Sequence, residues 1–177
     1  TDDTNVDFAS STVGGSLSGS VTEVAPFDGT TYTLTVSGMT GTGDVVVNIQ
    51  GGAATDLAGN FNSVSTSTDN TVTYDDVPPG LTITTPIASD NYVNSAAASS
   101  VIISGTSDAE DGRTVTLTSF DGSTTLNPTS VVSGSSWSVP VDFSSLADGN
   151  VTITADVTDL AGNAATSVNA NVTLDRT

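Results

Sequence analysis

Apolar and polar residues alternate along much of this chain. Thr, Ser, Asn or Asp stands between most of the apolar positions in the segments Tyr32–Val36, Val45–Ile49, Trp137–Val141 and Val151–Val157. A period of two residues places successive side chains on opposite faces of a strand, so one face is apolar and the other meets water. This pattern is typical of antiparallel sheets. No stretch has helical periodicity, and we expect an all-β protein.

Turn signals separate these segments. They stand at Asp28-Gly29, Gly41–Gly43, Asp111-Gly112, Asp121-Gly122 and Asp148–Asn150, and pairs of this kind favour the tight turns of β-hairpins. The strands between them recur at a spacing of roughly ten residues. Short strands at this spacing, each with one apolar face, indicate a β-sandwich in which two sheets bury those faces against each other.

A pentapeptide, Asp-Leu-Ala-Gly-Asn, occurs at residues 56–60 and again at residues 159–163. The copies start 103 residues apart, which is close to the ~100 residues of one β-sandwich domain. After each copy comes a Ser/Thr-rich alternating stretch, which ends at Asp75 in the first case and at Asp175 in the second. We therefore predict two tandem domains whose last strands are homologous.

The domain boundary is predicted where two prolines interrupt the chain, at Val77-Pro78-Pro79-Gly80, because proline cannot donate to a sheet ladder. The domains are then residues 1–76 and 77–177. Only 55 residues precede the first motif, whereas 78 residues, counted from Leu81, precede Asp159 in the second domain. The first domain is thus about two strands short. Either the sequence starts inside a domain, which we favour, or strands come from elsewhere, or the domain is a compact variant. We expect it to expose an apolar groove with unpaired edges, which is unstable alone or forms a strand-exchanged dimer.

The charge balance is strongly acidic and restricts the partners. The sequence contains 2 basic residues (Lys plus Arg) and 20 acidic residues (Asp plus Glu), which gives a net charge of −18. Nucleic acids and anionic membrane surfaces are therefore poor candidates as partners, and divalent cations are favoured. The alternative is that the acidity serves solubility alone. No apolar run approaches the ~20 residues that a membrane-spanning helix needs, and without cysteine no disulfide stabilises the domains.

The side chains available also argue against an enzyme. His, Cys and Lys are all absent, so no nucleophile can be paired with an imidazole, thiol or amine. Carboxylate pairs of the glycosidase kind remain conceivable. However, most acids here stand beside Gly at turns, where they serve turn chemistry. We expect no catalytic activity.

Trp137 has two interpretations. An exposed Trp provides a stacking surface for sugars, whereas a buried one fills a core. Trp137 alternates in phase with Val139 and Val141. This phase favours the core.

Several stretches resemble the bacterial Ig-like repeats of giant biofilm-type and RTX-type surface adhesins. They are residues 29–43, 54–60, 65–75 and 151–163, and with their flanking strands the likeness covers nearly the whole chain. The resemblance implies tandem immunoglobulin-like β-sandwiches that act as an extracellular extender on the bacterial surface, with neighbouring repeats as partners and calcium often bound at domain junctions. The alternative is a glycan- or protein-binding Ig-like module of a secreted or surface protein.

Calcium is the expected ligand, because it takes six to eight oxygen donors from carboxylates, amides and backbone carbonyls. In an Ig-like sandwich, the loop between the second and third strands and the loop between the last two strands lie at the end where the chain enters. These loops carry acids in the second domain, and the linker adds two more. The predicted ligands are Asp75, Asp76, Asp108, Glu110, Asp111, Asp156, Asp159 and Asn163.

The repeated motif has a simpler interpretation as well. Gly162 would take a positive φ, and Asp159 would cap the backbone amides of a tight turn. In the first domain the equivalents of Asp159 and Asn163 are Asp56 and Asn60. We expect a second, weaker calcium site there.

Overall fold

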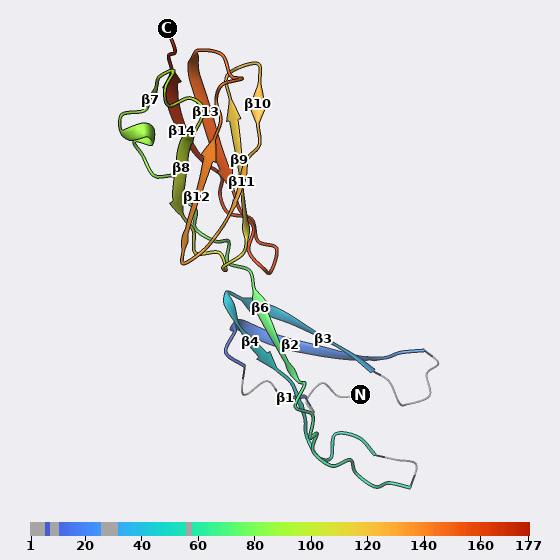
Figure 1. Cartoon of the computed structure of the whole chain (residues 1–177). Helices are drawn as coiled ribbons and strands as arrows, with labels where there is room; N and C mark the ends of the chain where they lie inside the picture. The colour runs from blue at the N-terminus through green and yellow to red at the C-terminus, as the bar shows by residue number, and fades with distance from the viewer. Residues whose placement is uncertain (1–5, 8–10, 26–31, 56–57) are drawn as a thin grey trace. The chain divides into compact units, whose positions relative to one another are not determined.

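The computed structural model describes residues 6–7, 11–25, 32–55 and 58–177 (Figure 1). The chain divides into two compact units, residues 1–77 (unit 1) and 78–177 (unit 2). Both are built from strands, as the alternating pattern predicts, and the described residues contain no α-helix. No helix found there is long and apolar enough to cross a membrane.

Unit 2 is a sandwich of two sheets. The larger sheet has the order β10-β9-β13-β14-β7, with β11 also paired to β9, and the smaller sheet pairs β12 with β8. All pairings are antiparallel except that of β7 with β14. The elements are the 3-10 helix η2 (Ile87–Ser89), β7 (Tyr92–Val93), β8 (Val101–Thr106), β9 (Thr114–Phe120), β10 (Thr125–Leu126), β11 (Thr129–Val131), β12 (Ser136–Val141), β13 (Gly149–Asp156) and β14 (Val168–Leu174).

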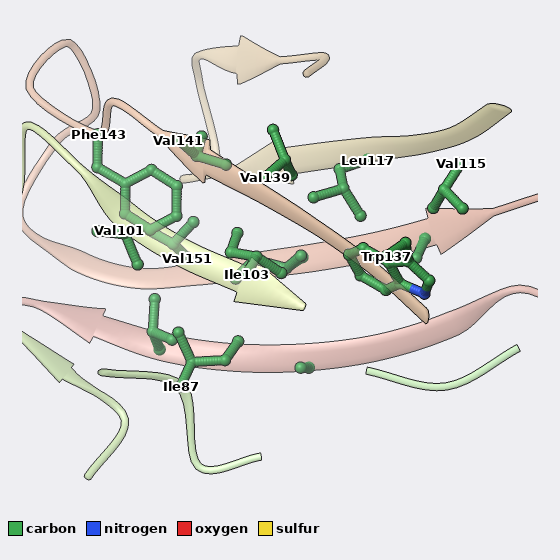
Figure 2. Close-up of a cluster of buried hydrophobic side chains, with 14 of the residues drawn as sticks. Ile87, Val101, Ile103, Val115, Leu117, Trp137, Val139, Val141, Phe143 and Val151 are labelled. Atoms are coloured by element: carbon green, nitrogen blue, oxygen red, sulfur yellow. The ribbon is translucent and has the colours of Figure 1, made fainter. Parts of the chain in front are cut away.

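Alternate residues of these strands fill the core of unit 2 (Figure 2). On β8, Val101 and Ile103 are buried while Ile102 between them is 56% exposed. Trp137 is only 3% exposed, which confirms its predicted place in the core. With few aromatic residues in the chain, the remaining core is made mainly of Val, Ile, Leu and Ala.

Gly105 allows the segment that enters unit 2 to lie close against β8. Thr82 N donates to Thr106 O at 2.9 Å, and Thr84 N donates to Ser104 O at 2.8 Å. A Cβ at Gly105 would overlap the carbonyl oxygen of Thr82 and would lie 2.7 Å from Trp137 Cζ2. Only glycine fits at this position without displacing backbone.

Unit 1 is assembled from smaller pieces. In its described part, three separate two-stranded sheets pair β1 with β5, β2 with β3 and β4 with β6. Of the apolar residues described there, only Val13 and Val45 are buried. The strands are β1 (Val6–Asp7), β2 (Gly14–Glu23), β3 (Tyr32–Thr40), β4 (Thr42–Val46), β5 (Asn48–Ile49) and β6 (Thr71–Asp75).

Candidate functional site

The described residues at and around the two copies of the pentapeptide have features in common. The motif follows β5 and precedes β6 in unit 1, and it lies between β13 and β14 in unit 2. The strand pairs β4 with β6 and β13 with β14 are both antiparallel. A bridge closes each loop, from Thr55 to Phe61 and from Thr158 to Ala164. The glycine of the motif has φ +85° at Gly59 and +99° at Gly162. This repetition supports a common ancestry of the two units.

Asp159 is the centre of the loop in unit 2. Its side chain is buried; Oδ1 accepts hydrogen bonds from Gly162 N and Asn163 N, both at 2.8 Å, and Oδ2 accepts one from Asn163 Nδ2 at 3.0 Å. Burial, the largest influence, opposes ionisation, but the hydrogen bonds from Asn163, Gly162 and Ala161 outweigh it and hold the pKa of Asp159 below its usual value. These contacts are the ones that a tight turn requires.

A second acidic loop meets this one. Glu110 Oε2 accepts a hydrogen bond from Leu160 N at 2.9 Å, so the loop at 107–112 is joined to the motif loop. Asp108 Oδ1 accepts one from Gly80 N at 2.5 Å, and Ser107 Oγ donates to Gly80 O at 2.9 Å. The entering residues and the two loops therefore meet at one end of unit 2, and carboxylates make the connections.

The other predicted ligands of unit 2 point elsewhere. Asp111 Oδ1 accepts a hydrogen bond from Gly134 N at 2.9 Å, in the turn before β12. Asp156 is bonded to the hydroxyl of Ser167. Neither side chain is directed at the motif loop by these contacts.

In unit 1, Asp75 and Asp76 bond within their own unit. Asp75 Oδ1 accepts from Thr42 Oγ1 at 2.5 Å and from Val77 N at 3.0 Å. Asp76 Oδ1 accepts from Gly41 N at 2.7 Å. Asn60 is exposed, and Asp56 lies outside the described residues.

The donors of these loops suit calcium chemically but are not gathered around one point. Carboxylate and amide oxygens are the ligands that calcium prefers. Among the residues that the structure describes, no group of three or more acidic side chains is arranged to hold a metal ion. Each carboxylate contacts a backbone amide or a hydroxyl instead. A cation would have to replace those partners.

Residues 82–176 match the family model of the bacterial Ig-like domain. The chain belongs to this family. No curated protein matches it. The Ig-like match is to a structural domain, and the absence of catalytic activity stays a prediction.

Solved structures of Ig-like repeats are similar as well. A tetra-tandem repeat in the extending region of a large adhesion protein is 24% identical, with a TM-score of 0.50, over 92% of this chain and 42% of that chain. A bacterial immunoglobulin-like domain from the M. primoryensis ice-binding adhesin is 32% identical over 55% of this chain and 98% of that one, with a TM-score of 0.38. A structure from a 1.5-MDa bacterial ice-binding adhesin is 26% identical over 93% of this chain and 54% of that chain, with a TM-score of 0.41. The chain thus spans less than half the length of the first of these.

The chain enters and leaves the Ig-like unit 2 at opposite ends of its sheets (Figure 1). Gly80 bonds to Asp108 at the end that carries the motif loop. Leu174 pairs with Gly149, at the other end of β13. At this exit, Arg176 Nε donates to Asp148 Oδ1 at 2.7 Å, and the two other guanidinium nitrogens donate to backbone carbonyls. This side-chain bond holds the pKa of Asp148 below its usual value.

Proposed function

We propose that this chain is a structural extender of a bacterial surface adhesin, in which Ig-like units joined end to end carry tension outside the cell. The observation that carries the proposal is that the chain enters and leaves unit 2 at opposite ends. Tension then runs along the strands. The similar tetra-tandem repeat comes from the extending region of a large adhesion protein, which agrees with this role. Neighbouring Ig-like repeats are the partners that it needs.

The strand order of unit 2 suits tension applied at its two ends. β7 runs parallel to β14, and Thr173 N donates to Asn91 O at 2.8 Å while Asp175 N donates to Val93 O at 2.9 Å. Pulling the ends apart slides these strands past each other. Because ladder hydrogen bonds lie across the strands, such sliding strains them together rather than one after another.

Single-molecule pulling tests this role. Since the chain has no cysteine, introduced cysteines can serve as handles. Handles at residues 80 and 177 should give a higher unfolding force for unit 2 than handles at residues 123 and 177. Residue 123 lies at the exit end, because Asp121 Oδ2 accepts a hydrogen bond from Ala147 N at 2.6 Å near Gly149. Equal forces in the two geometries would contradict the proposal.

We further propose that Ca²⁺ stiffens the chain through the loops at the end where the chain enters unit 2. Asp108, Glu110, Asp159 and Asn163 are the proposed donors there, because hydrogen bonds already bring their loops together. The further predicted ligands are Asp75, Asp76, Asp111 and Asp156. The predicted ligands of the second, weaker calcium site in unit 1 are Asp56 and Asn60. The net charge of −18 supports the proposal, because a bound cation would relieve the repulsion.

Melting with calcium and with EDTA tests the calcium proposal. Calcium at a hundredfold excess over its dissociation constant should stabilise unit 2 by about 2.7 kcal/mol, as followed by Trp137 fluorescence. Asp159→Ala should remove this increment. Asp121→Ala, at the opposite end of unit 2, should keep it whatever its own effect on stability. Small-angle scattering of the full chain should also show a narrower distribution of shapes in calcium. Identical melts and scattering at matched ionic strength would refute the proposal.

A further inference from the structure

Arg176 joins the end of unit 2 to the segment that precedes β13. Its Nε donates to Asp148 Oδ1 at 2.7 Å, and its Nη1 and Nη2 donate to Ser144 O at 2.8 Å and to Leu146 O at 2.7 Å. Its backbone N donates to Asp148 Oδ2 at 3.3 Å. All three partners lie between β12 and β13 in the sequence. We call these four residues the exit clasp.

The exit clasp is more than an ion pair. The chain contains 20 acidic residues, yet two of the three guanidinium nitrogens of Arg176 donate to neutral backbone carbonyls. A charge pair with Asp148 would need neither of these bonds. The planar guanidinium group presents its donors in fixed directions. Arg176 therefore holds the backbone of segment 144–148 as well as a side chain.

Asp76 occupies the corresponding place in unit 1, because it too follows a Val-Thr-x-Asp sequence at the end of the last strand. Asp76 Oδ1 accepts a hydrogen bond from Gly41 N at 2.7 Å, and Asp76 N donates to Gly41 O at 3.3 Å. Gly41 directly precedes β4, which pairs with β6 as β13 pairs with β14. The charge is opposite, but the residue again joins the end of the last strand to the start of its partner strand. Further chain follows it in this case.

We infer that the exit clasp passes tension from the chain that leaves unit 2 into β13 as well as into β14, an inference that rests on the proposed extender function. Tension applied at residue 177 reaches Arg176 before it reaches β14. Through the side chain of Arg176 it acts on segment 144–148, which leads into β13. β13 pairs with β9 from Thr152 to Asp156. The other neighbour of β14, β7, is only two residues long.

Without the exit clasp, tension would enter unit 2 through β14 alone. Asp175 N donates to Val93 O at 2.9 Å and Thr173 N donates to Asn91 O at 2.8 Å, so these bonds are among the first that it would meet. Attachments that act side by side each carry only part of an applied force. The exit clasp therefore lowers the force on the bonds at the end of β14, and unit 2 should survive longer under the same tension.

Lifetimes under constant force, measured with two pairs of cysteine handles, test the inference. Handles at residues 80 and 177 place the exit clasp in the path of tension, whereas handles at residues 80 and 123 span the same two ends of unit 2 without loading it. Arg176→Gln should shorten the lifetime of unit 2 at least about tenfold with the first pair, because hydrogen bonds from a charged group are lost. With the second pair it should shorten the lifetime by no more than about threefold, as loss of a partly exposed ion pair does.

Two further variants sharpen the comparison. Arg176→Lys keeps the charge, but its single ammonium group cannot reach the carboxylate and both carbonyls together, so its lifetime with the first pair should lie between those of the original chain and Arg176→Gln. Arg113→Gln is the matched control. Arg113 Nε donates to Thr158 O at 2.8 Å beside the motif loop, at the opposite end of unit 2. Its loss should change the lifetimes with both handle pairs by the same factor.

Two results would overturn the inference. One is a shortening by the same factor with both handle pairs in Arg176→Gln, since a contact that is merely structural gives this result. The other is a full lifetime in Arg176→Lys, because charge alone would then suffice. If Arg176→Gln does not fold, as judged by Trp137 fluorescence, Arg176→Lys carries the same comparison of handle pairs. The proposed extender function fails on a different result, equal unfolding forces of the original chain with handles at residues 80 and 177 and at residues 123 and 177.

Discussion

Two valines that occupy the same place in the last strands of the two units have opposite environments. Val72 and Val172 each begin a Val-Thr-x-Asp sequence, but Val72 is 70% exposed and Val172 is 2% exposed. In unit 2, β7 pairs with β14, and Val93 joins the core. In the described part of unit 1, β6 pairs with β4 alone. Alternation decides which face of a strand is apolar, whereas its burial depends on the strands that cover it.

The largest expected effect on stability is at the contact between β8 and the segment that contains Thr82 and Thr84. Gly105→Ala should destabilise unit 2 by about 3 kcal/mol or more, because the added Cβ meets the Thr82 carbonyl and the Trp137 ring. Denaturant unfolding followed by Trp137 fluorescence measures this. Gly80→Ala is the matched control, since its Cβ would lie 3.4 Å from Asp108 Oδ2. If Gly105→Ala lowered the stability of unit 2 only as little as Gly80→Ala does, the close contact of this segment with β8 would not explain why unit 2 differs from unit 1.

A smaller effect should separate the two valines themselves. Val172→Ala should cost unit 2 about 2 kcal/mol, because it leaves a cavity in a packed core. Val72→Ala should change the stability of unit 1 by less than about 0.5 kcal/mol, since its side chain is mostly exposed. Unfolding followed by both circular dichroism and Trp137 fluorescence distinguishes the units. Equal costs would show that Val72 is buried in solution, and the comparison between the units would fail.

The local pattern was sufficient to predict the strands and the inward face of β12. Trp137 alternates with valines, and a period of two residues needs no knowledge of the rest of the chain. The paired motif likewise predicted related local structure in the two units, and the same kind of bridge flanks both copies.

Contacts between residues far apart in sequence could not be predicted in this way. Asp111 bonds to Gly134, whereas we grouped it with the motif loop. Asp121 had the pattern of a plain turn residue, yet it also accepts a hydrogen bond from Ala147 N, 26 residues away. The parallel pairing of β7 with β14 likewise could not be predicted from the sequence pattern. Each depends on the path of the whole chain, and turn composition reports only the local backbone.

The described aspartates whose pKa is lowered by hydrogen bonds also distinguish the units. The described aspartates with a lowered pKa are Asp121, Asp142, Asp148 and Asp159, all in unit 2. For Asp121 the causes are the backbone amides of Thr124, Ala147 and Ser123, in that order. In unit 1, burial and the nearby Asp76 raise the pKa of Tyr74. Acid should therefore affect unit 2 through these aspartates.

The smallest expected effect is the dependence of unit 2 on acid. A carboxyl whose folded pKa lies below its unfolded value of about 3.9 stabilises the folded state above that value, and this contribution is lost as the pH falls through the folded pKa. The melting temperature of unit 2 should thus decrease when the pH is lowered below about 4. Asp121→Asn should lower it at neutral pH and flatten its fall in acid, because one of the responsible carboxyls is gone. Asp69→Asn removes the same charge from unit 1 and should leave the Trp137-reported curve unchanged. If both variants follow the original curve, relief of the net charge of −18 governs the acid response, and the hydrogen-bonded aspartates do not distinguish the units.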